Sequence, residues 1–128
     1  MKVDLNQLDW FINVIGIVTQ VIPQLSITIV TEENFTLDEE AQVRNRFPWV
    51  IVNRGGTNTL LADLMTLSSS KIFVASKSHF SALSGYLGPQ DGIIIVNEEN
   101  NYFETHKEIR NNVFTIHDPK LIERLSLP

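Results

Sequence analysis

The sequence predicts an α/β fold in which a mostly parallel sheet lies between two layers of helices. Segments with a helical spacing of apolar residues alternate several times with short segments rich in β-branched residues. The short segments are continuous apolar runs, which are typical of strands buried on both faces. The length of 128 residues and the 43% hydrophobic content suit one core. We therefore expect residues 1–128 to form a single Rossmann-like domain, a three-layer sandwich with four to five strands.

The first half of the chain has the clearest helical pattern. Leu8, Phe11, Ile15 and Val18 recur at intervals of three or four and predict a helix over 5–21, which ends before Pro23. In the helix expected at 37–47, the acidic residues precede the arginines, and this order of charges suits the helix macrodipole. The elements expected after the first helix are a strand at 26–30, a helix at 37–47, a strand at 49–52 and a helix at 60–67.

The second half continues the alternation. A strand is expected at 71–75, and the helix that follows it carries Phe80, Leu83, Tyr86 and Leu87 on one side. Gly88-Pro89 ends this helix. The last expected elements are a strand at 92–96, a strand at 113–116 and a helix that begins at Asp118-Pro119.

Composition excludes several classes of function. The chain has no cysteine, which excludes disulfides, thiolate metal sites and a cysteine nucleophile. Its three histidines lack ligand spacing, so we expect neither a metal nor a cofactor. The net charge of −5 disfavours duplex nucleic acid and anionic membranes as partners. No signal peptide or membrane-spanning run is visible, and a soluble cytoplasmic protein is expected.

The loops that follow strands are the expected place for a ligand. Right-handed crossovers put these loops at the carboxyl edge of a parallel sheet, where α/β proteins bind their ligands. Three loops qualify, at 31–34, 53–58 and 76–80. The third is the most suggestive, because it runs directly from a strand into a helix.

A diphosphate would suit the third loop. The first backbone N–H groups of a helix lack partners within the helix and favour an anion. Ser76, Ser78 and Ser81 add hydroxyl donors, Lys77 adds a positive charge, and His79 stands at the helix start. The structural alternative is that Ser78 is an N-cap and Lys77 a solvated side chain.

The other polar residues near the expected edge have two interpretations each. Asp63 is either an exposed acid near a helix start or a carboxylate that binds the ring N–H groups of a purine. Glu32 is either part of an acidic loop or half of a catalytic carboxylate pair with Glu33. Arg54 and the glycines after it form either a phosphate contact or an ordinary turn with positive φ.

Several of these segments together resemble the donor-binding half of fucosyltransferase-like glycosyltransferases with the GT-B fold. The resemblance covers roughly residues 8 to 105. The family shows an acid on a helix, then a strand, then an S-x-S-x-F-S turn and a helix with small residues. The matching segments are Ile29–Glu33, Asp63–Met65, Lys71–Ser81, Gly85–Leu87 and Asn101–Phe103.

This resemblance implies a function and a set of site residues. The domain would bind a nucleotide-sugar of the GDP-sugar type, for metal-independent transfer of the sugar to an acceptor hydroxyl. Ser78, His79 and Phe80 would contact the diphosphate, and Asp63 would face the guanine. The cleft would be lined by Thr31 and Glu32.

Two departures from the family pattern bear on activity. No basic H-x-R-type motif precedes the first strand, and Asn97-Glu98 stands where the family usually has a proline. The resemblance therefore implies half of an enzyme, with a separate amino-terminal domain supplying the rest, or a remnant without activity. The alternative from another class is a non-catalytic, oligomeric interaction module, which the apolar surplus of the first helix suggests.

Overall fold

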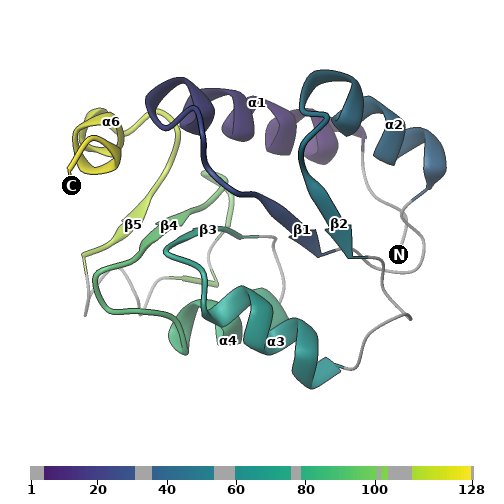
Figure 1. Cartoon of the computed structure of the whole chain (residues 1–128). Coiled ribbons are helices and arrows are strands. Elements are labelled where there is room, and N and C mark those ends of the chain that lie inside the picture. The colour runs from purple at the N-terminus through teal and green to yellow at the C-terminus, as the bar shows by residue number, and fades with distance from the viewer. Residues whose placement is uncertain are drawn as a thin grey trace. The chain divides into compact units, whose positions relative to one another are not determined.

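The computed structural model describes residues 5–30, 36–53, 60–75, 79–100, 102–103 and 111–127. Helices and parallel strands alternate along the chain, which confirms the predicted α/β class (Figure 1). The described elements are α1 (Leu5–Val21), β1 (Thr28–Val30), α2 (Leu37–Arg46), β2 (Ile51–Asn53), α3 (Leu60–Ser68), β3 (Ile72–Val74), α4 (His79–Tyr86), β4 (Ile93–Ile95), β5 (Val113–Phe114) and α6 (Pro119–Leu125). They belong to two compact units, 1–63 and 64–128.

The first unit is built around a parallel pair of strands. β1 and β2 pair with Ile29 opposite Val52, and α2 forms the crossover between them. The apolar stripe of α1 packs with the end of α2 and the approach to β2. The buried members of this core are Leu8, Ile12, Ile15, Val43, Phe47 and Val50.

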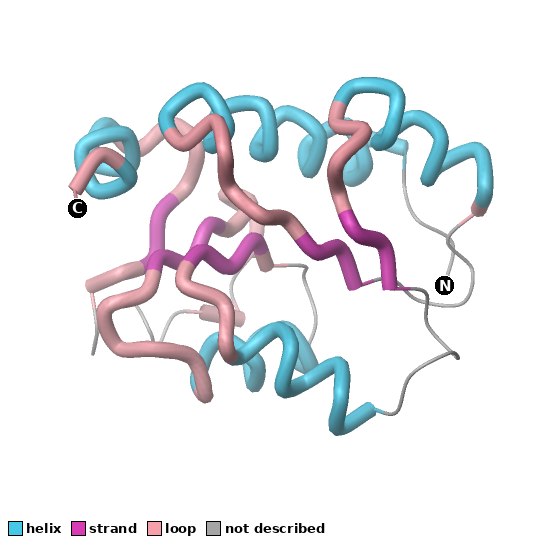
Figure 2. Tube along the Cα trace, in the orientation of Figure 1, coloured by secondary structure: helices cyan, strands magenta, loops and turns pink. Residues whose placement is uncertain are grey.

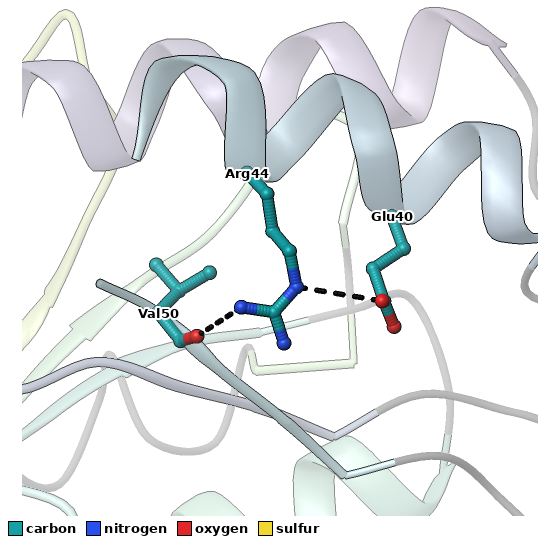
Figure 3. Close-up of polar contacts among 3 residues, drawn as sticks. All are labelled: Glu40, Arg44 and Val50. Carbon is teal, nitrogen blue, oxygen red and sulfur yellow. Dashed lines mark hydrogen bonds and ion pairs between the residues drawn. The ribbon is translucent and has the colours of Figure 1, made fainter. Parts of the chain in front are cut away.

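Both ends of α2 are fixed by side chains. At its start, the Thr36 hydroxyl accepts from the Glu39 N–H (3.1 Å), while the Glu39 carboxylate accepts from the Thr36 N–H (3.0 Å). This reciprocal capping box satisfies two N–H groups that the helix leaves without partners. Near its end, Arg44 pairs with Glu40 (3.4 Å) and donates to the carbonyl of Val50 (3.0 Å), which ties α2 to the entry of β2 (Figure 3).

The capping box gives a testable stability effect. Thr36→Ala removes the hydroxyl acceptor, and we expect it to lower the free energy of unfolding by about 1 kcal/mol. Thr36→Ser is the matched control, because it keeps the acceptor and should stay close to the parent. Urea unfolding of the three proteins measures the difference. Equal losses for the two variants would show that the hydroxyl bond is unimportant.

The second unit contains a three-stranded parallel sheet. β4 lies between β3 and β5, with Val74 opposite Ile95 and Ile95 opposite Phe114. All three residues of β4 are buried, as expected for a strand covered on both faces. Leu67 of α3 and Ala82 of α4 pack against the face formed by Phe73 and its neighbours. In Figure 2, α3 and α4 lie on one side of these strands and α6 lies on the other.

The arrangement of the sheet differs in part from the prediction. The described strands form two sheets, of two and three strands, where the sequence predicts one of four to five. Each described strand is also shorter than its apolar run; the run at 71–75, for example, yields a strand at Ile72–Val74. The parallel direction of all the described pairs is confirmed. Among the described residues, no helix is long and apolar enough to span a membrane.

Candidate functional site

The carboxyl edge of the β3–β4–β5 sheet is formed by the residues that directly follow these strands. Ala75 directly follows β3, is buried, and donates its N–H to the carbonyl of Ile95 (2.9 Å). Val96 follows β4 in the same way and donates to the carbonyl of Phe114 (2.9 Å). α4 begins at His79, four residues after Ala75. Three residues, 76–78, therefore separate Ala75 from the first residue of α4.

The structure describes only some of the residues that the sequence predicts for a site in this loop. Ser76 and Ser78 lie outside the described residues. His79 and Phe80 are the first two residues of α4. Ser81 belongs to the buried side of α4, and its side chain is almost fully enclosed.

The remaining predicted residues belong to other parts of the chain. Thr31 and Glu32 lie outside the described residues, directly after β1. Asp63 lies in the first turn of α3 and is partly buried. An acid in this turn interacts favourably with the helix macrodipole.

The loop after β4 is fixed by two asparagines. The Oδ1 atom of Asn97 accepts from the Glu99 N–H (3.0 Å), and that of Asn100 accepts from the Tyr102 N–H (3.0 Å). Asn100 is buried, and Phe103, three residues later in the chain, is part of the buried cluster that contains Phe73. These side chains build consecutive Asx-type turns, which hold the loop against the sheet. Sequence reasoning assigned no role to either asparagine, although two asparagines after a strand are a turn signal.

The loops after β4 and β5 meet at the same edge. Glu98 Oε1 lies 3.3 Å from Nε2 of His117, and both side chains are largely exposed. Asp118 then caps α6 by accepting from the Lys120 N–H (2.9 Å). This edge therefore combines two helix starts with exposed carboxylates, an imidazole and the cationic side chain of Lys120.

A pocket elsewhere in the second unit is too small for a nucleotide. It lies between α3, α4 and the starts of the strands, and Leu67, Ser84, Gly88 and Ile93 are among its lining residues. Its volume of about 10 Å³ is at the threshold for a single water molecule. The carboxyl edge is therefore a better candidate for a ligand than this pocket.

In the part of the chain that the structure describes, no group of three or more histidines, cysteines or acids lies close enough to hold a metal ion. Comparison of the chain with family models, with curated proteins and with solved structures finds no match.

Proposed function

We propose that this chain is a nucleotide-sugar-binding domain of the fucosyltransferase-like GT-B type, which takes a GDP-sugar through its diphosphate. The observation that supports this proposal is the start of α4 at His79, just beyond the carboxyl end of β3 in a parallel sheet. The first amides of a helix point away from it without helical partners, and the macrodipole favours negative charge there. Parallel α/β sheets bind ligands at this edge.

The proposal assigns a role to each predicted residue. Backbone amides at residues 76–81 bind the diphosphate, with the side chains of Ser76, Ser78, His79 and Phe80 around it. Ser81, whose side chain is enclosed, contributes its backbone amide. Asp63 faces the base, and Thr31 and Glu32 line the cleft. Binding requires no metal, because amides and hydroxyls supply the donors. A separate amino-terminal domain would bind the acceptor where transfer takes place.

A finer fold prediction is part of this proposal. The two parallel sheets are proposed to be parts of one sheet, in a three-layer Rossmann-like sandwich. The purely parallel pairing and the burial of β4 support this, because both are typical of a sheet covered by helices on its two faces. A cytoplasmic location, expected from the sequence, belongs to the same proposal.

Thermal unfolding in the presence of nucleotides tests the proposed function. A ligand at 100 times its Kd adds about 2.7 kcal/mol to the stability of the folded state. We expect GDP to raise the melting temperature by several degrees, and UDP and ADP to raise it less. No response to any of the three at millimolar concentration would reject the proposal.

A pair of charge variants tests whether GDP binds at the carboxyl edge. Ser78→Asp places a carboxylate beside the proposed diphosphate, and we expect it to weaken GDP binding at least tenfold. Ser69→Asp introduces the same charge at an exposed position just after α3, before β3 begins, and should leave binding unchanged. Equal weakening by both variants would indicate a general charge effect rather than a site at the carboxyl edge.

The alternative proposal is a non-catalytic, oligomeric interaction module. Of the α1 residues that widen its apolar side, Val14 is buried, whereas Trp10 and Ile17 are partly buried. The apolar residues that remain exposed include several on α3 and α4.

A further inference from the structure

Glu98 and His117 form an ion pair that bridges two loops at the carboxyl edge of the β3–β4–β5 sheet. Oε1 of Glu98 lies 3.3 Å from Nε2 of His117. The side chain of His117 is 74% exposed and that of Glu98 is 59% exposed, so water and ligands can reach both groups. An ion pair this exposed contributes little to stability. The pair can therefore be changed without unfolding the chain.

The pairing gives His117 the arrangement of a general base. A carboxylate this close to Nε2 favours the ring proton on that nitrogen. Nδ1 of the neutral ring is then an acceptor, which can take a proton from a hydroxyl or a water molecule. The neighbouring carboxylate of Asp118 accepts from the Lys120 N–H and caps α6. Glu98 is therefore the carboxylate that orients the ring.

The pair lies at the edge of the sheet that holds the proposed diphosphate site. Glu98 stands three residues after the end of β4, and His117 stands three residues after the end of β5. β3, β4 and β5 are parallel neighbours, so the residues that follow them lie at one edge. Neighbouring strands are about 4.8 Å apart, which separates β3 from β5 by about 10 Å.

This separation suits an attack on a nucleotide-sugar whose diphosphate is bound at the start of α4, after β3. A base and the water that it activates lie about 3 Å apart, and the water oxygen approaches its target carbon to about 3 Å. The linkage from that carbon through oxygen to phosphorus covers much of the remaining distance. We propose that His117 is the general base, and Glu98 its positioning residue, for hydrolysis of the nucleotide-sugar. The inference rests on the proposed function, which places the substrate at this edge.

The proposed reaction uses water as its second substrate. The water oxygen forms a bond to the anomeric carbon of the sugar, while Nδ1 of His117 takes the proton from the water. The bond between this carbon and the diphosphate oxygen breaks, and its electron pair goes to the departing GDP. The products are the free sugar and GDP, and the proton then passes from His117 to solvent.

Release of GDP from GDP-fucose by the full chain tests the proposal. We expect His117→Gln to lower kcat by on the order of 100-fold, the usual contribution of a general base, with KM unchanged. Glu98→Gln should lower kcat at least tenfold while leaving KM and the melting temperature unchanged, which a purely structural role would not predict. Glu123→Gln is the matched control, because it makes the same change at an exposed position of α6 and should keep the parent activity.

Hydrolysis in H₂¹⁸O identifies the bond that breaks. We expect the released GDP to contain no ¹⁸O, because the water oxygen enters the sugar. Labelled GDP would mean attack at phosphorus and would overturn the proposal. GDP binding without release of GDP from GDP-fucose, or release that both variants leave intact, would overturn the role of the pair but not the proposed function. Absence of GDP binding would reject both.

Discussion

Replacing Phe103 with alanine should lower the free energy of unfolding by about 3 to 5 kcal/mol. Phe103 is 0% exposed and belongs to the same buried cluster as Phe73, Ala75, Ile94 and Val96. Removal of the ring loses its transfer free energy and leaves a cavity that the strands cannot fill without moving. Domains of ordinary stability have a free energy of unfolding of about 5 to 15 kcal/mol. The variant would therefore lose a large share of this free energy.

Urea unfolding followed by circular dichroism measures this effect. Leu37→Ala is the control, because Leu37 is exposed on α2 and its truncation should change stability by less than about 0.5 kcal/mol. Comparable changes for the two variants would mean that Phe103 does not fill the core as described. The loop after β4 would then not be held against the sheet, and its turns would lose their structural role.

Truncation of Ile95 to alanine is expected to cost about 2 to 5 kcal/mol. Ile95 lies in the central strand β4, is 0% exposed, and stands between Val74 and Phe114 in the ladder. The substitution keeps the backbone hydrogen bonds, including the one from the Ala75 N–H, and removes side-chain packing alone. The loss therefore measures how tightly the central strand is packed.

Ile51→Ala provides the same chemical change in a different environment. Ile51 also lies in a strand, β2, but its side chain is exposed. We expect a loss below about 1 kcal/mol for this variant, since little apolar surface returns to water. If Ile51→Ala proved as costly as Ile95→Ala, the two strands would be similarly buried, contrary to the structure.

The sequence predicts the order and type of the elements well because their local signals are strong. The apolar stripe of the first segment gives a helix at the expected residues, Leu5–Val21, and Asp118-Pro119 begins α6 with Asp118 as its N-cap. Continuous apolar runs such as Ile93–Ile95 indicate burial on both faces from the sequence alone. Strand pairing depends on contacts between distant residues, so the grouping of strands into two sheets has no local signal.

Features that depend on tertiary environment are the ones that sequence reasoning missed. The apolar side of α4 looks like an ordinary core-facing stripe, yet Leu83 and Leu87 are exposed while Ser84 is buried. Periodicity identifies the sides of a helix but does not determine which side the core covers. The capping box of Thr36 and Glu39 does have a sequence signature, a threonine followed three residues later by a glutamate, and could have been predicted.

Residue patterns predict the elements on either side of the candidate site. The strand before Ala75 and the helix from His79 both follow from them. The turns made by Asn97 and Asn100 complete that edge with side-chain to backbone bonds across two residues. Which base and sugar would bind there depends on side-chain placement, which a residue pattern does not encode.

Backbone amides at the start of α4 are proposed to bind a diphosphate. Titration of the ¹⁵N-labelled chain with GDP, followed by amide chemical shifts, tests it most directly. We expect saturable shifts concentrated at residues 76–81, and small changes at Lys71 and Gly92 near the opposite ends of the strands. Saturable shifts that leave residues 76–81 unmoved, or no shifts at millimolar GDP, would contradict the claim.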